Sequence, residues 1–410
     1  MICVLTGGTG GAKFVDGLRQ VMPAEEITLV VNTGDDLLWW GLYVSPDIDS
    51  ITYVLSGMLS RERGWGVKGD TFLCLQAMGQ LGEPTWFHTG DRDLAVHLLR
   101  SRHLAEGKTL SEATALVCDK LGVKAHILPM SDSRVETRVD TPVGELSFEE
   151  YFVQRWYQDP VNSVRYAGAS DAEPAPGVIE AILAADAILI APSNPITSIG
   201  PILAVPGIRD ALLRAKGKIG AISPIISGAP VNGPAGILMT AQGLPCSIAG
   251  VAQAYEDFLD VLICDTRDAR AAEALRKTGV RVQCAQTIMR SPEDKAALAR
   301  TALGLVSASL LSNKGESTRS VPGDPSPSDR PSDEQASSNE APAQPSASQL
   351  SGDRSSGDRS SADHSPANHS PADHSSADHS SADHSSPEPP SSQAPVSRPF
   401  TRFHPVDDPS

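Results

Sequence analysis

Four short polar segments contain the residue types that can hold a phosphorylated ligand. Residues 7–11 read Gly-Gly-Thr-Gly-Gly, one residue after an apolar run at 2–5, so backbone N–H groups there can approach an anion closely. Small and polar residues also follow three later apolar runs, at 32–36, 191–201 and 223–236. One such cluster would be an ordinary turn, but four at one edge of a sheet indicate a binding site.

The glycine segment matches neither common phosphate-binding template. A dinucleotide fingerprint needs a third glycine at position 13, where the chain has Lys13, and a P-loop needs Ser or Thr after that lysine, where it has Phe14. The segment therefore predicts an anionic ligand without identifying it. A tight structural turn is the alternative interpretation.

Two aspartates fall in the first turn of a helix predicted at 46–55. Ser45 is the expected N-cap and Pro46 the first helical residue. We expect Asp47 to complement the helix dipole. Asp49 projects to a different side, and if that side faces the glycine segment, its carboxylate can hold Mg²⁺ or accept a hydroxyl proton.

A second charged segment contains His88, Asp91 and Arg92, with Asp93 next to them, at the start of an apparent helix. A solvated charged turn is as good an interpretation of this segment taken alone. Ser131, in a short polar segment further on, is typical of a strand end.

The elements that must position these residues alternate between strand and helix. Short β-branched runs and helical patterns follow one another, which predicts an α/β fold with a doubly wound, mostly parallel, Rossmann-like sheet. A helical and hairpin region at about 50–160 interrupts this alternation. Strands are expected at 2–5, 27–31, 186–191, 218–223 and 260–265, a hairpin at 134–148, and helices at 14–21, 90–104, 109–122, 176–185, 206–215, 252–259 and 291–306.

Composition divides the 410 residues into two parts. Residues 1–311 have the apolar content of a packed domain, whereas residues 312–410 are rich in Ser, Pro, Asp and His and predict a disordered low-complexity tail. The tail repeats every five residues, at His364, His369, His374, His379 and His384. We expect this repeat to contain no binding site, and weak metal binding is the alternative. Both parts are acidic, and the net charge of the whole chain is −16. This charge argues against a nucleic-acid partner.

The six cysteines are scattered and include no Cys-x-x-Cys pair. They are expected to be buried free thiols of a reducing compartment. The N-terminus does not have the pattern of a signal peptide, and no apolar run reaches membrane-spanning length. We therefore expect a cytoplasmic protein without a membrane partner.

Taken in order, these motifs resemble the 2-phospho-L-lactate transferase family of deazaflavin coenzyme F420 biosynthesis, CofD or FbiA. The segments that carry the resemblance are GGTGGAKFVDGL, VVNTGDD, SPDIDS, GDRDLA, LPMSD and APSNPITSIGPIL. The resemblance spans about residues 1–305. It implies a Mg²⁺-dependent enzyme, commonly a homodimer, that transfers a phosphorylated three-carbon acid from its guanosine-diphospho-activated form to the terminal ribityl hydroxyl of the deazaflavin Fo and releases GMP.

The resemblance also implies roles for individual residues. It places Asp49 and His88 among the residues that contact Fo, and we extend this group to Asp91 and Arg92. Asp49 is also the expected catalytic residue, either as a Mg²⁺ ligand or as the group that orients and deprotonates the Fo hydroxyl. The residues expected to face the guanosine diphosphate are Gly7, Gly8, Thr9, Gly10, Gly11, Lys13, Asn32, Asp35, Ser193 and Asn194. Which three-carbon acid is transferred (phospholactate, phosphoenolpyruvate or phosphoglycerate) stays open.

Two other functions compete with this one. A non-catalytic nucleotide- or sugar-binding regulator would share the fold and the glycine segment. A hydride-transferring dehydrogenase is weaker, because the fingerprint glycine is missing and no ribose-binding acid is evident.

Overall fold

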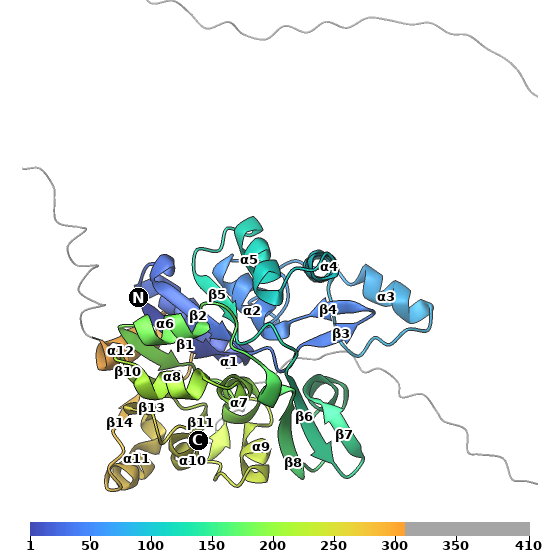
Figure 1. Ribbon diagram of the computed structural model, residues 1–410. Coiled ribbons are helices and arrows are strands. Elements are labelled where there is room, and N and C mark those ends of the chain that lie inside the picture. The colour runs from blue at the N-terminus through green and yellow to red at the C-terminus, as the bar shows by residue number, and fades with distance from the viewer. Residues whose placement is uncertain (308–410) are drawn as a thin grey trace, which may run out of the picture. The chain divides into compact units, whose positions relative to one another are not determined.

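A seven-stranded parallel sheet forms the centre of the computed structural model, which describes residues 1–307 (Figure 1). The predicted doubly wound α/β fold is confirmed. In order across the sheet, the strands are β14 (Val282–Ala285), β13 (Val261–Asp265), β10 (Lys218–Ile222), β9 (Ala187–Ile190), β1 (Ile2–Thr6), β2 (Ile27–Val31) and β5 (His126–Pro129).

The order of the strands reverses next to β1. From β1 the chain moves outward through β2 to β5, then returns to β9 on the other side of β1 and continues outward to β14. In open α/β sheets, ligands bind beyond the carboxyl ends of the strands at such a reversal. The fold therefore predicts a ligand site at the segments that follow β1 and β9.

Alternate side chains of each strand enter two different cores. In β1, Ile2 and Val4 enter one core, whereas Cys3 and Leu5 enter the other. The helices that cover the first face are α1 (Gly8–Val21), α2 (Pro46–Leu55), α5 (Leu110–Lys120) and α12 (Pro292–Val306). The helices on the second face are α6 (Val178–Ala184), α7 (Gly200–Ala204), α8 (Ile208–Arg214), α9 (Ala235–Ala241), α10 (Ile248–Ala254) and α11 (Ala269–Arg276).

Two additions interrupt the winding. Between β2 and β5 the chain forms a hairpin of β3 (Leu37–Trp39) and β4 (Leu42–Val44), followed by α2, α3 (Leu73–Gln80), α4 (Asp91–Ala105) and α5. Between β5 and β9 it forms an antiparallel sheet of β6 (Glu136–Thr141), β7 (Gly144–Ser147) and β8 (Ser163–Ala167). The hairpin predicted at 134–148 is present as β6 and β7.

Caps fix the ends of several helices. Thr109 caps α5 by accepting from the backbone of Glu112, whose side chain returns a bond to the backbone of Thr109. Ser291 and Asp294 cap α12 in the same way. Ser45 lies at the N-cap of α2 and Pro46 is its first residue, as expected.

Some boundaries differ from the prediction. The first helix begins at Gly8 rather than at residue 14, so most of the glycine segment is helical. The helix expected at 252–259 is α10, which starts at Ile248 and ends at Ala254. The remaining short elements are β11 (Ile225–Ile226), β12 (Ala229–Pro230), the 3-10 turns η1 (Ala24–Glu26), η3 (Ala169–Asp171) and η5 (Thr266–Asp268), and the π-helical turns η2 (Glu150–Gln154) and η4 (Pro195–Ile199).

No single helix within residues 1–307 is long and apolar enough to cross a membrane. One sharply bent pair, Pro195–Ala204 with Ile208–Arg214, passes by length and composition alone. The tail predicted at 312–410, with its histidine repeat, lies outside the described residues.

Candidate active site

The glycine segment is the N-terminal turn of α1, at the reversal point between β1 and β9. Gly7 is in an extended conformation before the helix, and its N–H donates to Ser193 Oγ at 3.3 Å. The hydroxyl of Ser193 in turn donates to the Gly7 carbonyl at 2.7 Å. The N–H of Gly8 donates to Asp47 Oδ1 at 2.6 Å. The chain's own carboxylate thus occupies part of the anion-binding end of α1.

Close packing explains two of the glycines. A Cβ atom on Gly10 would lie 2.3 Å from the carbonyl oxygen of Pro192, and one on Gly11 would lie 2.2 Å from Thr6 Oγ1. Both glycines are therefore needed for α1 to approach the ends of β1 and β9. Thr9 and Lys13 are exposed on the same helix.

Asn32 connects the loop after β2 to the start of α2. Its side-chain amide donates to Asp35 Oδ2 at 3.0 Å and to Asp47 Oδ2 at 2.9 Å, and it also contacts the Thr197 carbonyl. Its carbonyl oxygen accepts from the N–H of Gly34 at 2.9 Å. One buried amide therefore holds two carboxylates beside the glycine segment.

Four buried carboxyl groups belong to this region: Asp35, Asp36, Asp47 and Glu149. Burial, and for most of them the charge of neighbouring acids, raises their pKa values: to about 6 for Asp47, to about 8 for Asp36 and Glu149, and well above the usual value for Asp35. Asp36 accepts a hydrogen bond from Ser45 Oγ at 2.7 Å. Burial thus favours the protonated forms of these groups, and a cation bound here would displace the protons and favour the ionised carboxylates.

Asp49 faces away from the glycine segment, contrary to the expected phase of the helix. Its two carboxylate oxygens accept hydrogen bonds from Arg100 of α4, a side chain with no exposed surface, and Arg100 Nη1 lies 3.1 Å from Asp49 Oδ2. The contact with the glycine segment belongs to Asp47, which was assigned to the helix dipole. The role of Arg100 as the partner of Asp49 was not predicted. Arg100 lies at helical spacing from Val96 and His97, which are also buried on α4, and this spacing could have indicated that Arg100 is buried.

A histidine joins Asp49 to a second buried acid. His97 Nδ1 lies 3.5 Å from Asp49 Oδ2, and His97 Nε2 lies 3.4 Å from Asp93 Oδ1. Although burial acts to raise the pKa of Asp93, His97 and the hydroxyl of Tyr53 hold it below its usual value. Ligand atoms of Asp49, Asp93 and His97 lie within 4.8 Å of one another, so this cluster has the spacing of a metal site.

His88 lies in an aromatic environment before α4. Its ring centroid is 6.4 Å from that of Trp65 and 6.5 Å from that of Phe72. The guanidinium of Arg63 lies 5.0 Å from the centre of the Phe72 ring and 5.3 Å from that of Trp65. Burial lowers the pKa of His88. Flat aromatic and guanidinium groups of this kind are suited to a planar ligand.

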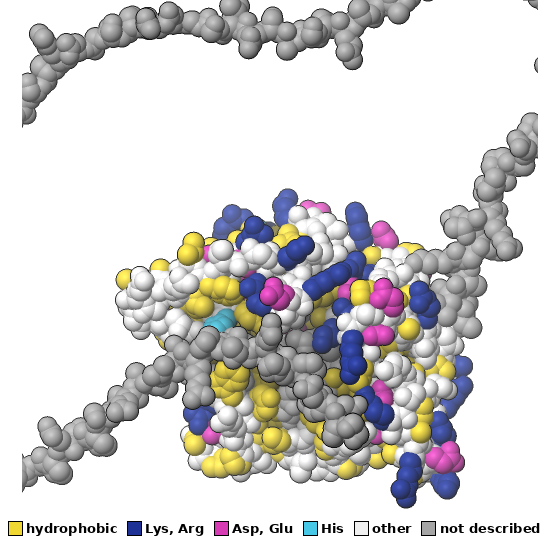
Figure 2. Space-filling view, turned by 180° about the vertical axis from the view of Figure 1, so that it is seen from behind, with side chains coloured by type: hydrophobic (Ala, Val, Ile, Leu, Met, Phe, Trp, Pro, Cys, Tyr) yellow, Lys and Arg dark blue, Asp and Glu magenta, His cyan; other side chains and the backbone are white. Residues whose placement is uncertain are grey.

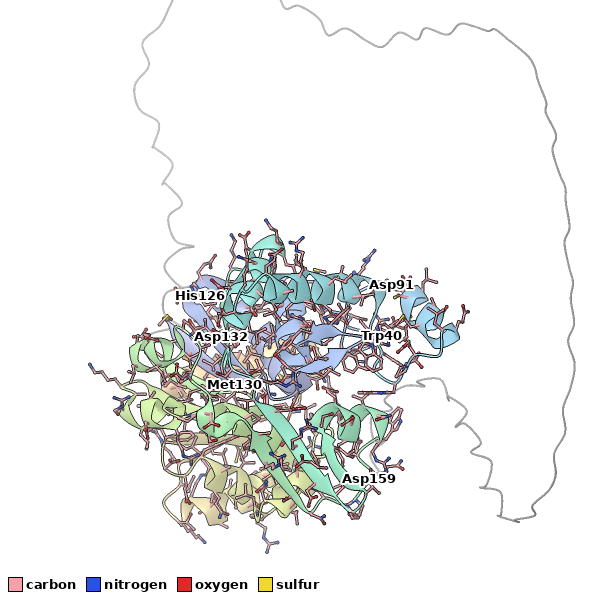
Figure 3. All side chains as sticks on the ribbon, turned by 45° about the vertical axis from the view of Figure 1, so that its right-hand side comes forward. Trp40, Asp91, His126, Met130, Asp132 and Asp159 are labelled. Carbon is pink, nitrogen blue, oxygen red and sulfur yellow. The ribbon has the colours of Figure 1, made fainter. Side chains whose placement is uncertain are left out.

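The side chain of Asp91 stabilises the start of the neighbouring helix α3. Its carboxylate accepts from the backbone N–H of Leu73 at 3.1 Å and of Cys74 at 2.9 Å, and thereby caps α3. Figure 3 shows Asp91 at the end of α4 nearest to α3. Asp70, from the segment before α3, reciprocates by accepting from the N–H of Arg92 at 2.8 Å. The side chain of Arg92 is exposed and donates to the Lys68 carbonyl at 3.2 Å.

Asn194 also caps a neighbouring element. Its side-chain oxygen accepts from the N–H of Ile196 at 3.0 Å, at the start of η4. The structure thus brings Gly7, Gly8, Asn32, Asp35 and Ser193 together at the reversal point. His88, Asp91 and Arg92 form a separate group at the start of α4, and Asp49 lies in the buried pair with Arg100. Asp36 and Glu149 are further buried acids of the region that were not among the predicted site residues.

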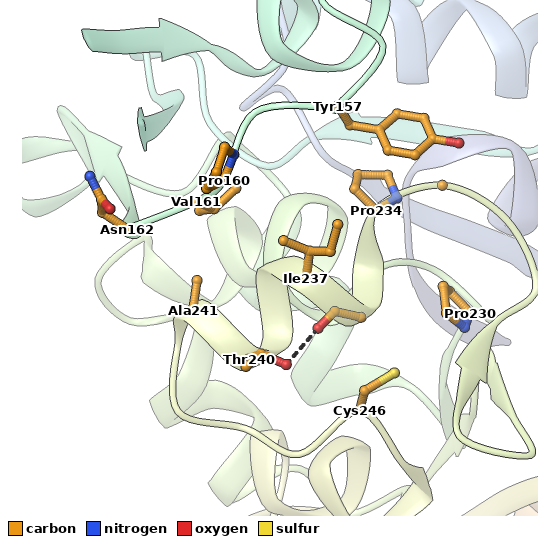
Figure 4. Close-up of a pocket in the computed structure, with 12 residues that line it drawn as sticks. Tyr157, Pro160, Val161, Asn162, Pro230, Pro234, Ile237, Thr240, Ala241 and Cys246 are labelled. Carbon is orange, nitrogen blue, oxygen red and sulfur yellow. Dashed lines mark hydrogen bonds between the residues drawn. The ribbon is translucent and has the colours of Figure 1, made fainter. Parts of the chain in front are cut away.

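A hollow of about 810 Å³ elsewhere on the molecule is mainly apolar (Figure 4). Its lining includes Tyr157, Pro234 and Ile237. Part of the polar segment 223–236 lines it, but none of the residues predicted individually for the site does. On the face shown in Figure 2, Lys and Arg side chains lie beside Asp and Glu side chains.

The family model and the sequence relatives indicate one family, and a solved structure shares the fold. The family model described as 2-phospho-L-lactate transferase CofD matches residues 2–301. A 2-phospho-L-lactate transferase of Methanosarcina acetivorans is 44% identical over 302 residues, covering 74% of this chain and 98% of the relative. A phosphoenolpyruvate transferase of Streptomyces griseus is 42% identical over 310 residues, covering 74% and 98%. A crystal structure of a UPF0052-family protein from Bacillus halodurans shares the fold at 18% identity, with a TM-score of 0.50 over 74% of this chain and 99% of that one.

Proposed function

The chain belongs to the CofD family of 2-phospho-L-lactate transferases, enzymes of F420 biosynthesis, and we propose that it joins a phosphorylated three-carbon acid to Fo with release of GMP. The observation that carries the proposal is the match to both phospholactate and phosphoenolpyruvate transferases over nearly their whole length. We assign the reaction to the reversal point of the sheet, where the start of α1 lies beside the buried carboxyl groups Asp35 and Asp47.

The proposed reaction is a displacement at phosphorus. The terminal hydroxyl oxygen of Fo attacks the phosphorus that carries the three-carbon acid, and the bond from this phosphorus to the oxygen shared with GMP breaks. The hydroxyl proton is released to solvent as the new P–O bond forms, and GMP leaves with the electron pair of the broken bond on its phosphate oxygen. Positioning and charge stabilisation supply most of the catalysis in such transfers.

For the donor, we assign the diphosphate to the start of α1. The exposed Thr9 and Lys13 lie on this first part of the helix, and its dipole favours negative charge. Asp47 already accepts from Gly8, so the diphosphate would lie beside this carboxylate rather than replace it. Because the Asp47 carboxylate and the diphosphate would repel each other at this distance, a cation is needed between them.

Asp47 and Asp35 fit Mg²⁺ better than Asp49 does. Both are oxygen donors held by one amide, and Mg²⁺ in phosphoryl-transfer sites is commonly bound by one or two carboxylates plus substrate phosphates. In the alternative cluster, the guanidinium of Arg100 already binds both oxygens of Asp49, and His97 offers nitrogen rather than oxygen. When bound, Mg²⁺ would neutralise charge that develops on the phosphate oxygens.

For the acceptor, we assign the deazaflavin ring to the aromatic group around His88. Trp65, Phe72 and Arg63 provide the flat surfaces that stack on a planar ring. Burial lowers the pKa of His88, so its imidazole is neutral at pH 7 and can donate or accept a single hydrogen bond to the polar edge of the ring.

The decisive experiment incubates the chain with Fo, Mg²⁺ and each guanosine-diphospho-activated acid in turn, and measures product mass and GMP. We expect a phosphodiester product and one GMP per product with at least one donor. The regulator on the same fold is the alternative function. It would bind a nucleotide or UDP-sugar in a thermal-shift assay, without a response to Fo and without product.

A further inference from the structure

Two thiols face each other at the far edge of the sheet from β5. Cys264 of β13 lies opposite Cys284 of β14 in the parallel register, and their Sγ atoms are 3.7 Å apart. Neighbouring strands are separated by about 4.8 Å, within the range of about 4.4–6.8 Å that a disulfide spans between Cα atoms. Both cysteines are free thiols.

The two thiols differ in access to solvent. β14 is the outermost strand of the sheet, and Cys284 is partly exposed, whereas Cys264 has no exposed surface. Arg276 holds its guanidinium beside the outer sulfur: its Nη2 lies 3.7 Å from Cys284 Sγ, and its Nε donates to the Val282 carbonyl at 3.0 Å. A fixed positive charge stabilises negative charge on a sulfur that acts as a nucleophile.

We propose that Cys264 and Cys284 form a peroxide-sensitive pair that closes reversibly to a disulfide. The Cys284 thiolate attacks one oxygen of hydrogen peroxide, which gives a sulfenic acid and, after protonation, one water. The Cys264 sulfur then attacks the sulfenic sulfur. The S–O bond breaks, the thiol proton leaves with the hydroxide as a second water, and two thiols have been oxidised by one peroxide.

Three of the other four cysteines have surroundings that differ from those of this pair. Cys3 and Cys118 are buried in different cores of the sheet. Cys246 is partly buried, and its thiol donates to the Gly228 carbonyl at 3.1 Å. Cys246 therefore provides a matched control, with similar access to solvent but with a backbone carbonyl as the partner of its thiol.

The test oxidises the full chain with a small excess of hydrogen peroxide, blocks remaining thiols, and maps the peptides by mass without reduction. We expect a peptide pair linked through Cys264 and Cys284, lighter by two hydrogens and separated by dithiothreitol. Cys284→Ser should remove this linkage and Cys246→Ser should keep it. The oxidised wild-type chain should also unfold at a higher temperature than the reduced one, because the bond ties the edge strand to its neighbour.

Oxidation of Cys284 to a sulfinic acid, or its capture by added glutathione, without the linked peptide would overturn the proposal. Linkage to a different cysteine would do the same. If Cys284→Ser does not fold, the wild-type comparison of peroxide-treated and dithiothreitol-treated chains decides the question by itself. None of these readouts depends on transferase activity, so they stand apart from the proposed function.

Discussion

Arg100 of α4 and Asp49 of α2 form an ion pair in which neither side chain is more than slightly exposed. Removing one partner of a buried pair leaves the other charge without compensation, which costs about 3–5 kcal/mol. We therefore expect Asp49→Asn to lower the free energy of unfolding by about this amount. Denaturant-induced unfolding measures it.

The double variant Asp49→Asn with Arg100→Gln is the matched control. Because it removes both charges, it should be more stable than Asp49→Asn alone. An Asp49→Asn chain with unchanged stability and lost turnover would contradict the structural role. Asp49 would then act as a free carboxylate at the reaction centre.

Gly10 is expected to be a packing position rather than a ligand contact. A Cβ atom there would overlap the Pro192 carbonyl, so Gly10→Ala should destabilise the chain by about 1–3 kcal/mol or more, as overpacking does. Thr9→Ala, one residue earlier and exposed, is the control and should unfold like the wild type. Wild-type stability of Gly10→Ala with weakened nucleotide affinity would show instead that the ligand contacts this backbone directly.

The sequence predicted five of the seven strands of the central sheet and most of the long helices, because alternation of apolar runs and turn residues is a local property. It did not predict β14, α3 or α9. It identified the residues at the strand ends, and the structure brings Gly7, Asn32 and Ser193 together there. The phase of α2 could not be predicted in the same way. Whether Asp47 or Asp49 faces α1 depends on where Arg100 lies, and that contact spans 51 residues of the chain.

A similar limit applies to Asp91. The sequence predicted that Asp91 lies in the first turn of a helix. It did not predict that Asp91 caps α3, because α3 itself was not predicted. The glycine segment is a third case. Its composition suggested a loop, yet tight contacts with Pro192 and Thr6 are what require glycine at positions 10 and 11.

Without Mg²⁺, stability should fall as the pH rises from about 4 to 8. Asp47 has its pKa raised to about 6, and Asp36 and Glu149 have theirs raised to about 8, mainly by burial. The folded chain thus retains protons that the unfolded chain has lost, and this contribution disappears once the pH passes the folded pKa values. Thermal unfolding in EDTA across this range measures the slope.

Glu149→Gln should make that slope shallower, since it removes one of these groups, whereas Glu25→Gln, an exposed control, should leave it unchanged. Added Mg²⁺ should stabilise the chain more at pH 8 than at pH 6, because a cation binds the ionised carboxylates. Greater stability at pH 8 than at pH 6 in EDTA would contradict the burial of these acids.

Residues 313–410 should be dispensable for turnover. The match to the Methanosarcina acetivorans transferase covers 98% of that relative and only 74% of this chain. We expect truncation after Ser312 to leave kcat/KM for Fo within about threefold of the full chain, well under 1 kcal/mol in activation free energy. A folded truncation that loses about a hundredfold would assign a catalytic role to the histidine repeat.

Asp47→Asn should be the most damaging single change for chemistry. The amide can still accept from the Gly8 N–H, so the contact between α2 and α1 can persist, although its NH₂ group would face that of Asn32. The substitution removes the charge that would hold Mg²⁺ against the diphosphate. Turnover should therefore fall by at least about a hundredfold, and the Mg²⁺ concentration for half-maximal rate should rise.

Steady-state rates at several Mg²⁺ concentrations, beside an unfolding curve, separate chemistry from folding for this variant. Asp119→Asn, on the exposed surface of α5, is the control and should keep both properties. If Asp47→Asn keeps wild-type turnover while Asp49→Asn is folded and inactive, the reaction centre lies on the Arg100 side of α2. The cation would then belong with Asp49, Asp93 and His97, whose ligand atoms already have suitable spacing.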